Sequence, residues 1–199
     1  VNYYAIYRQL HTLNYDANGG TGAPAATTAY GYYNSYGVQN NGSHTVSSTV
    51  PTRSGYTFSS WNTAKNGSGK SYVAGNTYVN SGASDTLYAQ WNVNTYTIKF
   101  EPNGGSVSPT SKTFTIESAI DLPTPSRTGY TFSGWKVTTA SGNWVKDTVY
   151  TGSSIAAGKY GDVTVTAQWT PITYTITYVY NNGSANTTAN YTIEQTITL

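Results

Sequence analysis

The sequence contains an internal repeat, and this feature constrains the fold more than any other. Residues 55–61 read Gly-Tyr-Thr-Phe-Ser-Ser-Trp, and residues 129–135 read Gly-Tyr-Thr-Phe-Ser-Gly-Trp. The tripeptide Ala-Gln-Trp ends at Trp91 and again at Trp169. Self-similarity of this kind predicts successive small units that share one arrangement of secondary structure.

The repeats divide the chain into two whole copies and part of a third. Repeat 1 spans residues 1–92 and repeat 2 spans residues 93–170. Repeat 1 is longer because it carries insertions near residues 8–13 and 30–48. Residues 171–199 match the first half of repeat 2, so we expect them to form a truncated third repeat.

The composition narrows the possible functions. Charged residues make up 9% of the chain and the formal net charge is +2, whereas an average domain has about 25% charged residues. This balance excludes a polybasic nucleic-acid-binding protein. The chain has no cysteine, which excludes disulfide scaffolds, thiol nucleophiles and cysteine-ligated zinc. No apolar run approaches the ~20 residues of a membrane-spanning helix, so we expect no membrane insertion.

Each repeat contains four segments that alternate apolar and polar residues, as half-buried strands do. In repeat 2, Tyr96, Ile98 and Phe100 share one face of the first such segment, and Lys99 lies on the other. Asn-Gly-Gly follows at residues 103–105, and glycine permits the positive φ of a tight turn, so we expect a β-hairpin. The predicted strands of repeat 2 are residues 95–100, 113–116, 130–135 and 163–169.

The segment between the second and third strands predicts a short helix. Residues 117–122 are long enough for one or two helical turns, which Pro123 and Pro125 would end. Each repeat then has the order β-β-α-β-β, so the predicted fold class is α+β and strand-dominated. Short connections between the repeats predict an elongated arrangement.

Four tryptophans are predicted to be core residues rather than a platform for a ligand. Trp91 and Trp169 continue the apolar face of a final strand, and that face must be covered. Trp61 and Trp135 end the repeated Gly-Tyr motif. A unit of ~75 residues has a small core, and each large aromatic side chain adds ~150–250 Å² of buried surface.

Read together, the motifs resemble the Listeria–Bacteroides repeat, the internalin B-repeat type of bacterial surface module. Repeat 2 carries Asn-Gly-Gly at residues 103–105, Pro-Thr-Pro-Ser-Arg-Thr-Gly-Tyr-Thr-Phe-Ser-Gly-Trp at 123–135 and Thr-Ala-Gln-Trp at 166–169. Repeat 1 carries the matching residues at 51–61 and Leu-Tyr-Ala-Gln-Trp at 87–91, with Ser60 in place of the glycine before the tryptophan. The resemblance covers essentially the whole chain.

This resemblance implies tandem β-grasp (ubiquitin-like) modules of a secreted or wall-attached bacterial protein, with roles as stalk, spacer and adhesion surface. A shared fold does not by itself identify a ligand. The residues to which the resemblance gives a structural role are Gly55, Tyr56, Phe58, Trp61, Trp91, Gly129, Tyr130, Phe132, Trp135 and Trp169.

A search for catalytic residues finds none that form a recognisable set. The only histidines are His11 and His44, which we expect to be ordinary surface residues. The carboxylates are scattered, and Asp16 begins a turn that lacks the acid spacing of a calcium loop. Gly-Lys-Ser at residues 69–71 lacks the first glycine of a phosphate-binding loop, since position 64 is alanine. We therefore predict no enzymatic activity, no cofactor and no metal.

The insertion of repeat 1 is rich in tyrosine and predicts a binding surface. Tyr32, Tyr33 and Tyr36 are the candidate ligand-binding residues, which could stack on a sugar ring or pack on a partner protein. The alternative is that residues 30–36 simply extend the second strand. Rings buried in the core of repeat 1 would end the binding hypothesis.

The leading functional hypothesis is a non-catalytic extracellular module that acts as a stalk or spacer at the bacterial cell surface and provides an adhesion or protein-interaction surface. The alternative is a glycan-binding adhesin module that uses the tyrosine-rich insertion. Expected partners are neighbouring repeats of the same chain and a host or bacterial surface protein or glycan, with no nucleic acid. We also expect the truncated third repeat to pack on repeat 2 or to pair with the strand edge of another chain.

Overall fold

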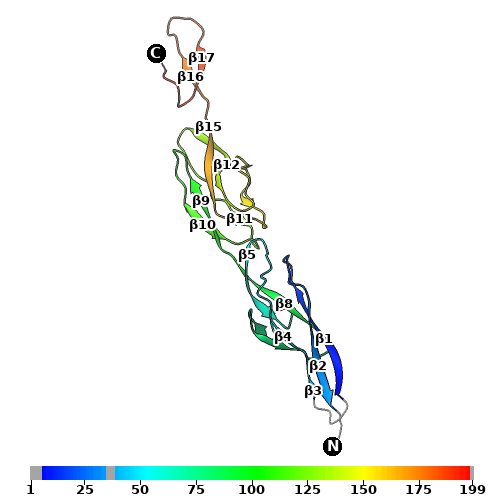
Figure 1. Ribbon diagram of the computed structural model, residues 1–199. Helices are drawn as coiled ribbons and strands as arrows, with labels where there is room; N and C mark the ends of the chain where they lie inside the picture. Colours follow the sequence, from blue (N-terminus) through cyan, green and yellow to red (C-terminus); the bar gives the residue numbers. More distant parts are fainter. Residues whose placement is uncertain (1–5, 35–38, 198–199) are drawn as a thin grey trace, which may run out of the picture. The chain divides into compact units, whose positions relative to one another are not determined.

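Strands, turns and loops make up all of the chain that the structure describes, residues 6–34 and 39–197 (Figure 1). This computed structural model divides into unit 1, Val1–Asn94, and unit 2, Thr95–Leu199. The described residues contain no helix, so the predicted α+β class and the β-β-α-β-β order are wrong, and the fold is all-β.

Unit 1 is built on a six-stranded sheet with the order β3-β2-β1-β8-β5-β6. Among the described strands of unit 1, only β1 and β8 pair in parallel, and a small second sheet pairs β4 with β7. The strands are β1 (Ile6–Asp16), β2 (Thr27–Asn34), β3 (Gln39–Asn40), β4 (Ser43–Thr45), β5 (Tyr56–Asn62), β6 (Ser71–Tyr72), β7 (Thr77–Val79) and β8 (Ser84–Val93).

Unit 2 repeats this design in a five-stranded sheet with the order β10-β9-β15-β12-β13. Its first strand again pairs in parallel with a late strand, here β15, which pairs antiparallel with β12. The strands are β9 (Tyr96–Glu101), β10 (Ser111–Phe114), β11 (Ile120–Asp121), β12 (Tyr130–Ala140), β13 (Val149–Tyr150), β14 (Ser154–Ile155), β15 (Val163–Pro171), β16 (Tyr174–Tyr178) and β17 (Thr187–Tyr191).

The segment predicted to be helical is extended instead. A turn at residues 116–118 leads into β11, which pairs with β14. Ile120 and Leu122 are buried and Asp121 is exposed. Two apolar residues two positions apart lie on one face of an extended chain but point in different directions on a helix. The core of unit 2 therefore selects the extended conformation, in which both side chains are buried.

Asn-Gly-Gly forms the predicted turn after the first strand in both units, within the connection that leads to the second strand. Asn18 and Gly19 have φ values of 48° and 87°, and Asn103 and Gly104 have values of 50° and 84°. Antiparallel hairpins follow, β1 with β2 and β9 with β10. These left-handed backbone conformations explain why asparagine and glycine occupy the turn.

Each unit has its own aromatic core. In unit 1 the Trp61 ring is fully buried and packs edge-on against Tyr15, with ring centres 4.9 Å apart. In unit 2 Trp135 is fully buried, and its ring centre lies 5.2 Å from that of Phe100. Such pairs add to the burial energy because the edge of one ring meets the face of another.

Trp91 and Trp169 are half-buried at the edge of these cores. The Trp91 indole N–H donates to the carbonyl of Ala17 at 3.1 Å. The Trp169 indole N–H donates to the carbonyl of Pro102 at 3.0 Å. Each tryptophan thus ties a late strand to the turn that follows the first strand.

The β16–β17 hairpin contacts the start of β12 within unit 2. The Tyr130 hydroxyl donates a 3.0 Å hydrogen bond to the Glu194 carboxylate. The Ile172 amide donates to the Gly129 carbonyl at 2.9 Å. The side chain of Ile193 lies so close to Gly129 that a Cβ there would approach it to 2.7 Å. Glycine is therefore the residue that fits at this contact.

Candidate binding surface

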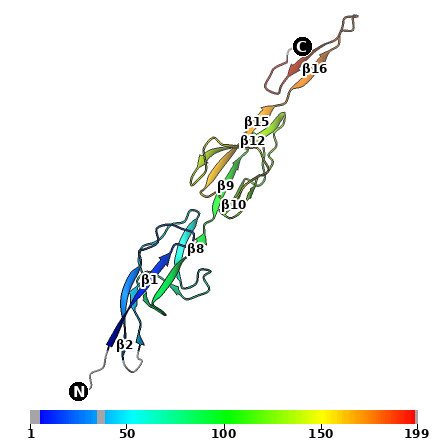
Figure 2. The same cartoon turned by 90° about the vertical axis from the view of Figure 1, so that its right-hand side faces the viewer.

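The strands β1 and β2 form a long hairpin at the N-terminal end of unit 1, where they lie side by side (Figure 2). The pairing of β1 with β8 begins only at Thr12 and Ser84. Among the described residues, the part of β1 before Thr12 therefore pairs with β2 alone. This is the insertion that makes repeat 1 longer than repeat 2.

The pairing register places Arg8 opposite Tyr32 and Leu10 opposite Tyr30. Residues directly opposite one another in an antiparallel pair lie on the same face. Leu10 is 49% exposed, Tyr30 52% and Tyr32 43%. We call Arg8, Leu10, Tyr30 and Tyr32 the tyrosine face.

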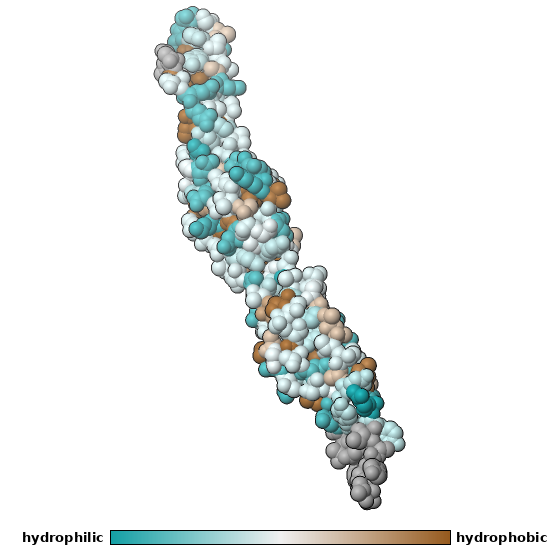
Figure 3. Space-filling model, viewed as in Figure 1, coloured by the Kyte–Doolittle hydropathy of each residue, from teal (hydrophilic) through white to brown (hydrophobic). Residues whose placement is uncertain are grey.

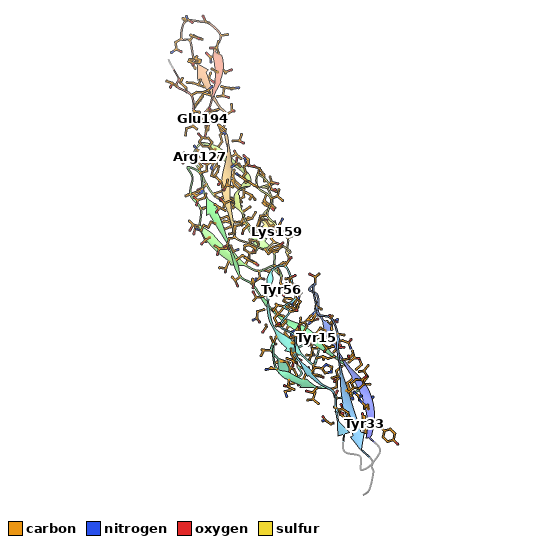
Figure 4. All side chains as sticks on the ribbon, in the orientation of Figure 1. Tyr15, Tyr33, Tyr56, Arg127, Lys159 and Glu194 are labelled. Atoms are coloured by element: carbon orange, nitrogen blue, oxygen red, sulfur yellow. The ribbon has the colours of Figure 1, made fainter. Side chains whose placement is uncertain are left out.

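The opposite face of the hairpin is turned toward the core. His11 and Leu13 lie on it, and both are buried. Tyr33 lies opposite Tyr7 on this same face. Tyr33 is half-buried, and its hydroxyl donates a hydrogen bond to the side-chain oxygen of Gln9. Figure 4 labels Tyr33 near the outer end of the hairpin.

Arg8 organises the tyrosine face. Its guanidinium carbon lies 4.0 Å from the centre of the Tyr30 ring and 5.8 Å from that of Tyr32. A guanidinium over an aromatic face is attracted by the electron density of the ring. The arrangement places one cation close to two exposed tyrosine rings.

The structure thus separates the three tyrosines proposed from the sequence. Tyr32 is on the tyrosine face, Tyr33 is on the opposite face, and Tyr36 lies outside the described residues. Arg8, Leu10 and Tyr30 were not among the candidate residues. Only the hairpin register brings Arg8 to the two rings, and no local sequence pattern gives that register.

Figure 3 shows that the face in view carries apolar residues in small, separate groups rather than in one continuous patch. Tyrosine has a polar end and an apolar ring, so a tyrosine surface suits ligands that offer both characters.

A second group of polar residues lies inside unit 1. His11 is 1% exposed and His44 is 5% exposed, so the expectation that these are surface residues is wrong. His11 Nδ1 lies 2.7 Å from the Gly82 carbonyl, and His44 Nδ1 lies 2.9 Å from the Thr27 hydroxyl. Among the described residues, Nε2 of each ring has no hydrogen-bond partner. Burial lowers the pKa of His44 below its ordinary value.

Next to these rings, Asp85 fixes the loop before β8. Burial alone would raise the pKa of Asp85, but hydrogen bonds from the Ser81 amide and the Tyr78 hydroxyl hold the pKa below its usual value. The Tyr78 hydroxyl donates to the carboxylate at 2.8 Å. Burial and this bond raise the pKa of Tyr78. The histidines and Asp85 thus belong to the packing of unit 1.

No three His, Cys, Asp or Glu side chains come together as metal ligands within the described ranges. That part of the chain also holds no helix with the length and apolar character needed to cross a membrane.

Comparison with known proteins identifies the repeat. The Listeria-Bacteroides repeat domain matches residues 11–90 and 96–168. A Gly-rich protein of Evansella cellulosilytica, which its name assigns to the membrane, is 38% identical over 144 residues, covering 66% of this chain and 16% of that protein. Internalin H of Listeria monocytogenes is 36% identical over 126 residues, covering 61% of this chain and 20% of that protein. No solved structure shows significant similarity.

The matched region spans a fifth or less of each of these two relatives. An internalin and a protein that its name assigns to the membrane carry the repeat, so it occurs in bacterial surface proteins. Because the domain match covers most of both repeats and more than half of the chain, this protein belongs to the Listeria-Bacteroides repeat domain family.

Proposed function

We propose that the chain is a non-catalytic, extracellular repeat module of a bacterial surface protein, where it acts as a spacer and provides an interaction surface. The supporting observation is that both units use the same motif residues for the same packing contacts. The guanidinium of Arg53 lies 3.8 Å from the Tyr56 ring centre, and that of Arg127 lies 3.7 Å from the Tyr130 ring centre. Residues used in this way stabilise the units.

The tryptophans of the motif support the same proposal. Trp61 and Trp135 are buried in the cores, and the indole N–H groups of Trp91 and Trp169 bond to carbonyls of the first turn. Side chains that fill a core and bond to the backbone stabilise the fold, and a spacer module requires a stable fold.

The connections along the chain also favour a spacer. β8 ends at Val93 and β9 begins at Tyr96, so two residues connect them. β15 ends at Pro171 and β16 begins at Tyr174, which again leaves two residues. Connections this short restrict how far successive elements can move independently, and proline restricts the second one further.

Distance measurement between spin labels tests the spacer proposal. The chain has no cysteine, so Lys65→Cys and Lys146→Cys give two unique labels, one in each unit. We expect one narrow distance distribution. Its width should equal that of a control pair within unit 2, Thr110→Cys and Lys146→Cys. A broad distribution, or several populations, would contradict the spacer proposal.

The second candidate function is a glycan-binding adhesin module. The observation that favours it is the tyrosine face, where Tyr30 and Tyr32 are exposed beside Arg8 instead of entering the core of unit 1. A protein partner is the other class of ligand that such a surface could take.

A further inference from the structure

We propose that the tyrosine face of unit 1 binds a glycan that carries carboxylate groups, with Arg8 pairing with the carboxylate while Tyr30 and Tyr32 stack on sugar rings. This inference rests on the proposal that the chain is an extracellular surface module, and it gives the interaction surface a chemical class of ligand.

The first step is that Arg8 forms no ion pair among the residues that the structure describes. Both ion pairs among the described residues lie in unit 2, so Arg8 has no carboxylate partner among those residues. Its guanidinium carbon lies 4.0 Å from the centre of the Tyr30 ring. The N–H donors lie in the guanidinium plane, at its edge, and a planar carboxylate can accept two of them in parallel.

The second step is the local charge. Residues 6–34 contain Arg8 and Asp16 as their only Lys, Arg, Asp or Glu residues. Asp16 stands at the far end of β1, about 27 Å away along an extended strand. The tyrosine face therefore has a net positive charge that no neighbouring acid on the hairpin cancels, and this favours an anionic ligand.

The third step is the spacing of the rings. Tyr30 and Tyr32 are two positions apart on one strand, which separates their attachment points by about 7 Å. That spacing is close to the size of one sugar ring and its linkage. Leu10 adds an apolar flank. The exposed Asn40, which pairs with Tyr32 between β2 and β3, offers an amide for sugar hydroxyls. The face thus combines apolar ring contacts with a few polar groups, as ligand sites usually do.

A single cation also argues against a nucleic acid as the ligand. Binding a nucleic acid requires several neutralised phosphates, and here one Arg stands among uncharged residues. One carboxylate held by Arg8, with two neighbouring sugars stacked on Tyr30 and Tyr32, matches the observed balance of one cation to two rings.

The test is an NMR titration of the full chain with a galacturonic acid hexamer, compared with the methyl ester of the same hexamer. The ester keeps the sugar rings and removes the charge. We expect the acid to shift the amide signals of β1 and β2, with an affinity about ten-fold or more above that of the ester, because a charged hydrogen bond is lost. Equal binding of the acid and the ester, shifts located elsewhere, or no binding of the acid would overturn the proposal.

Variants separate the role of the surface from non-specific charge. Arg8→Gln should weaken binding of the acid about ten-fold, and Tyr32→Thr should weaken the acid and the ester alike. The matched control is Lys70→Gln, which removes another exposed cation that lies 5.1 Å from a tyrosine ring, Tyr72, in the same unit. It should leave the affinity unchanged. If Arg8→Gln and Lys70→Gln have the same effect, the site is wrongly assigned.

Amide signals outside the hairpin report whether each variant still folds, so lost binding can be separated from lost structure. The spin-label distances report the spacer proposal and do not depend on Arg8. Failure of one proposal is therefore distinguishable from failure of the other.

Discussion

The guanidinium carbon of Arg127 lies 3.7 Å from the centre of the Tyr130 ring. The same side chain lies against the first turn of unit 2, where a Cβ on Gly104 would meet Arg127 Cζ at 3.3 Å. Its Nη1 also donates to the Asn103 carbonyl at 3.3 Å. One arginine thus links the Asn-Gly-Gly turn to the start of β12, which explains the role of this residue in the repeated motif.

Arg127→Ala should lower the free energy of unfolding of unit 2 by about 0.5–1 kcal/mol, the range for a cation–aromatic contact at an exposed site. Urea denaturation followed by tryptophan fluorescence measures this loss. The control is Lys99→Thr, which removes an exposed cation of the same unit from a strand position that tolerates threonine. Equal stability of the two variants would contradict a stabilising role for the arginine.

Gly105→Ala should destabilise unit 2 by about 1–3 kcal/mol, as overpacking does. A Cβ at this position would approach the Ser126 carbonyl oxygen to 2.4 Å and the Trp169 ring to 2.8 Å. The backbone at Ser126 cannot move without disturbing its pairing with Ser106. Thermal unfolding compares this variant with Gly152→Ala, where the nearest atom would be 3.7 Å away and no loss is expected.

Trp135→Ala should cost about 3–5 kcal/mol, because it removes a fully buried ring and leaves a cavity. The variant also leaves the Pro123 carbonyl without the indole N–H that donates to it at 3.0 Å. Amide hydrogen exchange across unit 2 measures the loss. Val145→Ala serves as the control because Val145 is exposed. If Val145→Ala lowered the protection of unit 2 as much as Trp135→Ala does, the core role of Trp135 would be ruled out.

Unit 1 should lose stability as the pH falls below about 6.5, the ordinary pKa of histidine. Burial lowers the pKa of His44 in the folded chain, so the unfolded chain binds more protons in this range. The contribution of neutral His44 to stability is fully present above the pKa of histidine in the unfolded chain. It decreases as the pH falls toward the lower pKa of His44 in the folded chain. Asn80, His11 and Asp85 are the groups that act on this ring.

Hydrogen exchange at pH 7.5 and pH 5.5 measures this dependence. Both histidines lie in unit 1, so unit 2 provides an internal reference without histidine titration. His44→Gln, which stays neutral at both pH values, should flatten the pH dependence of unit 1. A variant that remains as acid-sensitive as the native chain would show that another group is responsible.

Local sequence patterns predicted the elements that depend on nearby residues. The alternation around Ile98 and Phe100 gave a strand with these two side chains buried, and Asn-Gly-Gly gave a turn with positive φ in both units. The internal repeat predicted that the two units would share one arrangement of strands. They do: in each unit the first strand pairs in parallel with a late strand, β1 with β8 and β9 with β15.

Contacts between residues far apart in the sequence decided the conformation of residues 117–122 and the burial of the histidines. Residues 117–122 had no strong local preference, and the pairing of β11 with β14 made them extended. His11 and His44 are buried because strands from distant parts of unit 1 enclose them, which their immediate neighbours in sequence do not indicate.

The sequence alone established the repeated units, their strand-rich composition and the turns between the first strands, because alternation and glycine conformations are properties of a few adjacent residues. The tertiary structure alone placed Arg8 beside Tyr30 and Tyr32 and turned Tyr33 to the other face. The physical reason is that strand register depends on which face is buried, and a shift by one residue would exchange the two faces.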